Sequence, residues 1–301
     1  MTIYVYIAFP DLALESLGLD YRNLKIATYL NQNIQSVSEQ ACAQGVLPGM
    51  TLGMASTLCP DLLLKPENKK KQRKSLHRLA LWAYKYSNQV AILDQALCLE
   101  ITKSTLLLGD LPNISQILKT ESQKYCNRIL FAFGYTPEMA ALFVKHRKCP
   151  KEYAFLDTVF SIQITECGLH QNHAKRLTNM GFRTLGEYFK APTRARQTRL
   201  PKEIYLELNA LAGRYHKPIQ WFTPPKRFAQ SLEFLCGLTT YEMLRFPMNR
   251  LLYEASQWLR IQHSATSALH WRFKFEHSKY VEKTITLNQP SAQMETFSEP
   301  T

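Results

Sequence analysis

The amino-acid sequence predicts an α+β fold made of several domains. Segments near both ends of the chain, at 3–8 and 269–276, alternate apolar with polar residues, as strands with one buried face do. Between them lie segments in which apolar residues recur every three or four positions, a pattern typical of amphipathic helices. A chain of 301 residues is long enough for about two domains, with one to four possible.

The composition is that of a globular protein. Hydrophobic residues make up 46% and charged residues 20% of the chain, which excludes wholesale disorder and a collagen-like or coiled-coil rod. No apolar run approaches the ~20 residues that span a bilayer, so no membrane partner is expected. The seven cysteines are scattered without a C-x-x-C pair, and the N-terminus lacks the basic region of a secretion signal. We therefore expect free thiols and a cytoplasmic protein.

The charge of the chain is strongly positive. Lysine and arginine total 37 against 24 aspartates and glutamates, which gives a net charge of +13. Residues 1–65 carry three basic and five acidic side chains, so the whole excess lies after residue 65. Such an excess favours a polyanionic partner, most often nucleic acid, over a merely basic soluble protein.

The first half of the chain is predicted to form one α+β domain with an insertion after its first strand. Pro10 ends the first strand, Ser36–Glu39 has the spacing of a helix capping box, and Thr136-Pro137 has the N-cap and N1 residues of a helix. The predicted elements, in order, are a strand at 3–8, helices at 11–17, 36–45, 50–58 and 69–86, a hairpin of 97–102 with 105–108 around Lys103-Ser104, a helix at 112–125, a strand at 128–133 and a helix from 136. This order is a ferredoxin-like βαββαβ pattern whose first connection is enlarged.

The second half begins with a basic helical region. Residues 166–217 hold ten basic against four acidic residues, and Thr184–Glu187 is another capping box. Residues 221–226 are a plausible linker. Beyond it, a helical stripe at 248–259 and a hairpin of 269–276 with 281–287 predict a second α+β unit.

Several segments together resemble one family. Ser38–Met50 followed by Ala55–Pro66 resembles the fingers of Y-family (UmuC/DinB-like) DNA polymerases, and Gly134–Pro137 resembles the segment before the last helix of their palm. The stretch Ile7–Leu14 is similar to ImuB, the catalytically degenerate branch of that family. Residues 168–188 resemble the helix-hairpin-helix of the thumb, and 231–287 the start of the little finger.

The resemblance implies a right-hand arrangement of domains. The palm would comprise 1–10 and 77–157, the fingers 11–76, the thumb 158–223, and a partial little finger 226–301. Only fourteen residues follow Leu287, so we expect a truncated little finger. Residues 293–297 loosely resemble a sliding-clamp peptide, but the first turn of a helix is the preferred interpretation.

The resemblance also implies that the polymerase chemistry is lost. Nucleotidyl transfer needs two divalent metal ions held by carboxylates. Active relatives place one aspartate at the end of the first strand and an Asp-Glu pair on the central hairpin, where this chain has Ala8 and Gln95-Ala96. We expect no catalytic residue, no metal and no cofactor, with Mg²⁺ implied only if the protein is an active polymerase.

The nucleotide-binding positions are altered as well. The family's triphosphate ligands in the fingers align with Glu39 and Cys42, and its palm lysines align with Met139 and Phe143. An anionic Glu39 would repel a triphosphate.

Two other carboxylates could in principle replace the missing ones. Asp11 lies beyond Pro10, and Asp94 precedes Gln95 by one residue. A shift of one residue in a strand turns the side chain to the opposite face, so both would have to be displaced together. We expect Asp11 to be a helix N-cap and Asp94 a turn residue.

DNA binding is the function expected to remain. A helix-hairpin-helix grips phosphates through backbone N–H groups at a helix N-terminus, aided by basic side chains. The second hairpin glycine of the family is His170 here, whose Cβ could block the approach of a phosphate. The predicted contacts are Gly168, His170, Asn172, His173, Lys175, Arg176, Arg183 and Thr184. The basic run 69–74 is more typical of a solvated helix face, with phosphate contact as the alternative.

The resemblance thus implies a bacterial, non-catalytic accessory factor in error-prone translesion synthesis and DNA repair, acting in the SOS response to DNA damage. Family resemblance implies a sliding clamp, a RecA-like accessory protein and an error-prone replicative-type polymerase as partners. An active, divergent lesion-bypass polymerase is one alternative. A simple helix-hairpin-helix DNA-binding module and a nonfunctional remnant are the others.

Overall fold

The computed structural model describes residues 2–18, 21–148, 150, 154–194, 196, 200–232, 234, 238, 240–274 and 280–298. The chain divides into two compact units, Met1–Leu12 with Gln72–Phe222, and Ala13–Lys71 with Thr223–Thr301. Of the predicted second hairpin, residues 275–279 lie outside the described residues.

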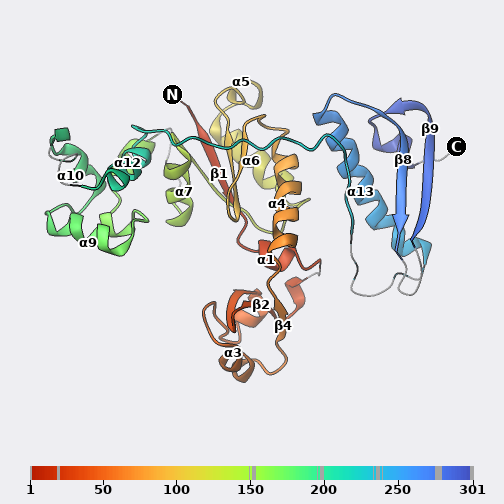
Figure 1. The fold of residues 1–301 in the computed structure, drawn as a ribbon, viewed down its shortest axis with the longest axis horizontal. Coiled ribbons are helices and arrows are strands. Elements are labelled where there is room, and N and C mark those ends of the chain that lie inside the picture. The colour runs from red at the N-terminus through yellow and green to blue at the C-terminus, as the bar shows by residue number, and fades with distance from the viewer. Residues whose placement is uncertain are drawn as a thin grey trace. The chain divides into compact units, whose positions relative to one another are not determined.

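The first unit is built on a four-stranded antiparallel sheet (Figure 1). Its strands, in spatial order, are β5 (Val90–Ile92), β6 (Ala96–Glu100), β1 (Tyr4–Ala8) and β7 (Leu130–Gly134). The crossover helices are α4 (Lys69–Ala83) and α6 (Leu111–Ser122). This strand order is that of a ferredoxin-like βαββαβ domain, as the sequence predicts.

One face of this sheet is the main core. Alternate residues of β1 and β6, such as Val5, Ile7 and Leu97, pack with Leu79 of α4 and Ile114 of α6. The other face carries Tyr4, Ala91 and Cys98, which are covered by Ile219 and Trp221. The backbone N–H of Phe222 also donates to the carbonyl of Val90 at 2.6 Å. The predicted linker at 221–226 is therefore wrong at its start, because Trp221 and Phe222 belong to this unit.

A helical region completes the first unit. After α7 (Pro137–Lys145), its helices are α8 (Phe155–Phe160), the 3₁₀ turn η2 (Ile164–Glu166), α9 (Gln171–Asn179), α10 (Leu185–Lys190) and α12 (Lys202–Leu211). The Thr136 hydroxyl donates to the Ala210 carbonyl at 2.8 Å and so ties the start of α7 to α12. The two parts share one hydrophobic core.

The predicted hairpin around Lys103-Ser104 is wrong. Thr105–Leu108 forms a short helix, α5, and β6 pairs instead with β5 through a tight turn at 93–95. The Ser104 hydroxyl donates to the carbonyl of Tyr86 at 2.5 Å, which fixes the chain where a strand would have to continue. The apolar run 105–108 cannot by itself distinguish a helix turn from a strand.

The second unit contains two further sheets. Within 13–71, β2 (Ile26–Leu30) lies between antiparallel β3 (Asn33–Val37) and parallel β4 (Leu63–Pro66). This part also contains α1 (Leu12–Glu15), the 3₁₀ turn η1 (Tyr21–Asn23), α2 (Glu39–Cys42) and α3 (Leu52–Leu58). The predicted capping by Ser36 is wrong: Ser36 lies in β3, and Ser38 caps α2 by accepting from the Ala41 N–H.

The C-terminal part of this unit has one long helix and a two-stranded sheet. Helix α13 (Tyr241–Ile261) begins at the N-cap Thr240, and β8 (Thr266–Phe273) pairs with β9 (Val281–Ser291). Residues Met294–Ser298 form the short helix α14, in agreement with the preferred interpretation of 293–297. Among the residues that the structure describes, no helix is long and apolar enough to cross a bilayer.

Candidate functional site

The three predicted metal-ligand positions lie together at one end of the first sheet. Ala8, the last residue of β1, pairs directly with Ala96, the first residue of β6. The N–H of Phe9 donates to the carbonyl of Gln95 at 3.2 Å. The side chains at these three positions are thus two methyl groups and a neutral amide, and Ala96 is only 1% exposed. These residues do not fit a divalent metal ion, which needs charged oxygen ligands.

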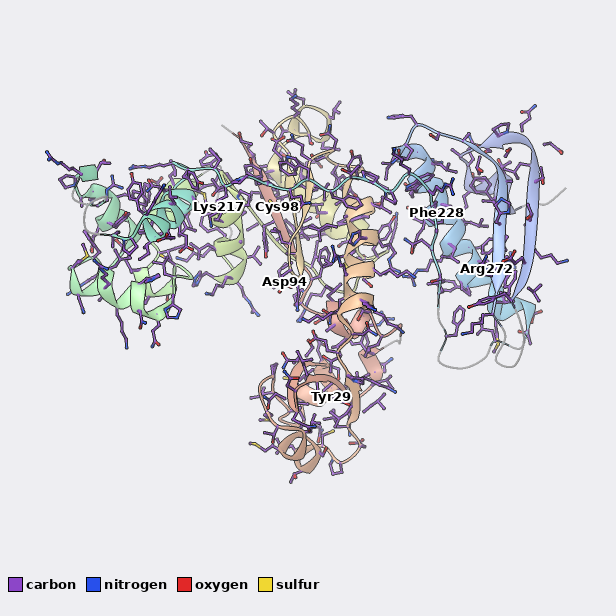
Figure 2. The ribbon with its side chains drawn as sticks, viewed as in Figure 1. Tyr29, Asp94, Cys98, Lys217, Phe228 and Arg272 are labelled. Carbon is purple, nitrogen blue, oxygen red and sulfur yellow. The ribbon has the colours of Figure 1, made fainter. Side chains whose placement is uncertain are left out.

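The nearby Asp11 is already paired with a cation. Its Oδ1 lies 2.8 Å from Nη2 of Arg128, which precedes β7. Asp11 directly precedes α1, and its carboxylate makes this ion pair with a distant segment. Its role as the N-cap of α1 stays a prediction. Asp94 is exposed in the β5–β6 turn, as expected (Figure 2). Among the residues that the structure describes, no group of three or more His, Cys, Asp or Glu could hold a metal ion.

The predicted nucleotide-binding positions divide into buried and exposed pairs. Met139 and Phe143 of α7 are fully buried, and the Phe143 ring lies 6.4 Å from that of Phe155. These positions serve the core and present no group to a ligand. Glu39 and Cys42, the first and last residues of α2, are exposed in the other unit.

The turn before α9 has a backbone conformation that favours glycine, as the presence of Gly168 in the sequence predicts. Gly168 has φ +80°, a conformation that favours glycine over residues with a Cβ. It connects η2 to α9. Helix α9 ends at a second glycine, Gly181, whose N–H donates to Thr178 while that of Phe182 donates to Leu177. This is the hydrogen-bond pattern of a Schellman motif.

His170 caps α9 and needs no glycine conformation. Its φ and ψ are −55° and 142°, and its Nδ1 accepts from the N–H of Asn172 at 3.4 Å. The imidazole ring thus occupies one N–H at the start of α9, and the expected obstruction by the Cβ stays a prediction. The ring of His173 lies 5.7 Å from that of His170.

The remaining predicted contacts surround this helix start. Asn172, Lys175 and Arg176 are exposed on α9. Thr184 is the N-cap of α10 and accepts from the Glu187 N–H at 3.2 Å, while Glu187 accepts from the N–H of Arg183 at 2.7 Å. The capping box thus closes one residue earlier than its usual form. Its polar groups hold the hairpin together, and the Arg183 side chain remains exposed.

Sequence reasoning missed two groups from α7. A Cβ placed on Gly168 would lie 4.0 Å from Nζ of Lys145, and Nε2 of His146 lies 2.8 Å from the carbonyl of Glu166. Both residues are about twenty positions away in sequence from the groups they approach, so only the tertiary fold reveals them.

Some basic side chains of this region pack against aromatic rings or form ion pairs within the fold. Arg196 is 4% exposed, and its guanidinium lies 5.3 Å from the ring centre of Tyr188. Arg214 lies 4.6 Å from the ring centre of Phe189. Lys217 lies 3.7 Å from the carboxylate of Glu138. Fewer of the ten basic residues are thus available to a ligand than their number indicates.

Comparison with solved structures identifies the fold. A post-insertion binary complex of Dbh DNA polymerase matches with a TM-score of 0.60 at 15% identity, over 96% of this chain and 89% of that one. An insertion ternary complex of the same polymerase gives 0.58 at 14% identity, over 98% and 90%. The chain has the fold of a Y-family DNA polymerase. DinB from Sulfolobus solfataricus also matches, with a TM-score of 0.55 at 15% identity over 98% and 91%.

The sequence comparison supports this Y-family fold over the first half of the chain. Residues 14–140 match the family model described as the impB/mucB/samB family. No curated protein matches the chain in sequence.

Proposed function

We propose that this protein is a Y-family polymerase relative that binds primer-template or damaged DNA without extending it. It acts as an accessory factor in error-prone translesion synthesis and DNA repair. This assignment combines the polymerase fold with a sheet end that lacks the carboxylates of nucleotidyl transfer.

The pairing of Ala8 with Ala96 carries the proposal. Two metal ions held by carboxylates activate the attacking oxygen and neutralise the phosphates in such reactions. A methyl group supplies neither charge nor a ligand atom. The buried Met139 and Phe143 support the same conclusion at the nucleotide site, because neither can contact a triphosphate.

DNA binding is supported by the helix-hairpin-helix and its charges. The start of α9 combines the Gly168 turn with exposed Asn172, Lys175 and Arg176. Backbone N–H groups and basic side chains of this kind position a protein on a phosphate backbone irrespective of sequence. The similar structures include binary and ternary complexes of Dbh DNA polymerase.

An active, divergent polymerase is the second candidate. Asp11 follows the end of β1 and Asp94 precedes the start of β6, so both flank the sheet end at which the metal ligands are expected. Activity would require Arg128 to release Asp11 and both carboxylates to turn toward one Mg²⁺ site. We therefore rank this function below the non-catalytic one.

The wider assignment follows from this role. A sliding clamp, a RecA-like accessory protein and an error-prone polymerase are the proposed partners, in the cytoplasm and during the SOS response. In a complex of this kind, the protein would bind and position the DNA while the partner polymerase performs the synthesis.

One assay separates the two functions. A labelled primer-template is titrated with protein across salt concentrations, and deoxynucleotides with Mg²⁺ or Mn²⁺ are then added to the same tube. The proposal predicts that log K falls with log salt and that the primer is not extended. Salt-independent binding, or extension by the wild-type protein, would overturn it.

A further inference from the structure

The short helix α5 carries the two most exposed large hydrophobic side chains among the described residues. Leu106 is 87% and Leu107 is 90% exposed, and the two are adjacent in sequence. Single exposed leucines are common on protein surfaces, whereas neighbouring apolar side chains that project into solvent mark contact sites for other molecules. Burial of leucine is favourable, so a surface that covers this pair gains binding energy.

Helix α5 is fixed at both of its ends. The Ser104 hydroxyl donates to the carbonyl of Tyr86, and Nδ2 of Asn113 donates to the carbonyl of Leu108 at 2.6 Å. Leu108 also packs against the main core of the first unit. The two exposed leucines therefore project from an ordered segment, and binding does not have to pay the entropy of ordering it.

A groove of about 770 Å³ lies beside the two leucines. It is formed mainly by the segment between α4 and β5 and by the segment between β6 and α5. Its aromatic side chains are those of Tyr4, Tyr84, Tyr86 and Trp221, and Leu107 also lines it. The leucine pair and the groove are thus one continuous surface, which we call the α5 surface.

The α5 surface lies away from the sheet end at which the metal-ligand positions gather. Ile101 and Thr102, which precede α5, hydrogen-bond to Ile3 just before β1, whereas Ala8 and Ala96 pair at the other end of that strand. Figure 1 shows α5 beside the N-terminal end of β1. A molecule bound to the α5 surface therefore does not have to cover the Ala8 end of the sheet.

The charges of this region argue against nucleic acid as its ligand. Residues 84–110 carry two lysines and three acidic residues, a net charge of −1 in a chain whose total is +13. Of the charged residues that line the groove, Lys85 lies 3.9 Å from Glu121. The other two, Glu100 and Lys103, form no ion pair within the described part of the chain. The groove thus offers one charge of each sign.

We propose that two copies of this chain associate through their α5 surfaces about a two-fold axis. In such a dimer both copies use the same patch, so that residue i of one contacts residue j of the other and the reverse. The leucine pair of each copy enters the groove of the other, and Lys103 of each lies opposite Glu100 of the other. A patch that holds a projecting apolar pair, a groove and both charges is complementary to itself.

Analytical ultracentrifugation of the full-length protein without DNA tests this inference. At about 0.5 M salt, which screens the repulsion between two positive chains, we expect a monomer–dimer equilibrium within about 1–100 µM protein, as for a small interface. L106Q/L107Q should raise the dimer dissociation constant at least about tenfold. The matched control M243Q/F246Q removes two exposed apolar side chains from α13 and should change it less than about threefold. A wild type that stays monomeric throughout, or a control with the same effect, overturns the inference.

Exchange of the two charges tests the two-fold contact itself. K103E and E100K each place like charges opposite one another in the dimer, so each alone should associate about tenfold more weakly than wild type. In an equimolar mixture the two variants present opposite charges at both contacts, and dimers should return to about the wild-type level. A mixture that associates no better than its components overturns the two-fold pairing.

Thermal unfolding in dilute protein checks that the variants fold. L106Q/L107Q and K103E alter exposed side chains and should unfold within about 3 °C of wild type. The leucine comparison does not depend on E100K, which loses the acceptor of the Thr102 N–H. Because no DNA is present, absence of the dimer leaves the proposed function standing, and L106Q/L107Q should bind DNA with the wild-type salt slope.

Discussion

Asp11 Oδ1 and Arg128 Nη2 lie 2.8 Å apart and join the end of β1 to the start of β7. The carboxylate nearest in sequence to the missing metal ligand is thus held by a cation. Arg128 is 50% exposed, so the pair itself contributes only about 0–1 kcal/mol to stability. We expect Arg128→Gln to leave the protein folded and still unable to extend a primer. Primer extension by Arg128→Gln would show instead that this ion pair suppresses a competent site.

A carboxylate introduced at the buried Ala96, at the end of the first sheet, should destabilise the protein. Ala96 is 1% exposed, whereas its neighbour Gln95 is exposed. We expect Ala96→Glu to destabilise the protein by about 2–4 kcal/mol, because it overpacks the site and buries a charge. Gln95→Glu is the control and should change stability by about 0.5 kcal/mol at most. Urea unfolding measures both, and equal midpoints for the two variants would contradict the packing described for Ala96.

The lysines of active relatives cannot be restored in α7. Met139 and Phe143 are fully buried, so Met139→Lys or Phe143→Lys places an unpaired cation in the core. We expect each to cost about 3 kcal/mol or more and to fail to improve nucleotide binding. Denaturant unfolding and nucleotide titration provide the measurements. A Met139→Lys protein that is stable and binds a triphosphate would show that the buried side of α7 can become accessible to a ligand.

The turn before α9 should require its glycine. Gly168→Ala forces φ +80° on a residue with a Cβ, which costs about 1–2 kcal/mol, and should weaken DNA binding together with stability. Gly53, inside α3, is the matched control: a Cβ there meets nothing within 4 Å. Gly53→Ala is expected to stabilise by about 0.5–1 kcal/mol without changing DNA affinity. Unchanged DNA affinity in Gly168→Ala would argue against the hairpin as a contact.

The buried thiol of Cys167 makes stability sensitive to alkaline pH. Burial, followed by the neighbouring Glu166, raises its pKa from 9.0 to about 12. The unfolded thiol loses its proton above about pH 9 while the folded one retains it, so the free energy of unfolding should fall between about pH 9 and 12. Cys42 is exposed and should react faster than Cys167 with an alkylating agent at pH 8. Cys167 reacting as fast as Cys42 in the folded protein would contradict this burial.

The sequence predicts three of the four strands of the first sheet, β1, β6 and β7, but not β5, in whose place it predicts a strand at the helix α5. Thr136 and Thr184 are N-caps, as their sequence contexts indicate. The β2–β3 hairpin escapes prediction because its turn uses Asn31 and Gln32, both with positive φ, and lacks the glycine that usually marks such a turn. The capping-box spacing with Glu39 favours Ser36 as the cap, and only the pairing of β3 with β2 shows that Ser38 caps α2 instead.

The candidate site is predictable where it depends on residue type and not where it depends on tertiary packing. That Ala8 and Ala96 cannot bind a metal follows from their side chains. The ion pair of Asp11 and the approach of Lys145 to Gly168 depend on contacts between distant segments. Nothing in the sequence distinguishes the buried Arg196 from a surface arginine. Only the structure shows that it packs on Tyr188 in the interior.

Single-turnover primer extension tests the central claim most directly. Protein in excess over a labelled primer-template receives all four deoxynucleotides with Mg²⁺ and, separately, Mn²⁺, and an added active polymerase then shows that the template is usable. We predict that the protein alone leaves the primer unextended although it is bound. Extension by the wild-type chain that is abolished in Asp11→Asn or Asp94→Asn would contradict the account and establish a rearranged metal site.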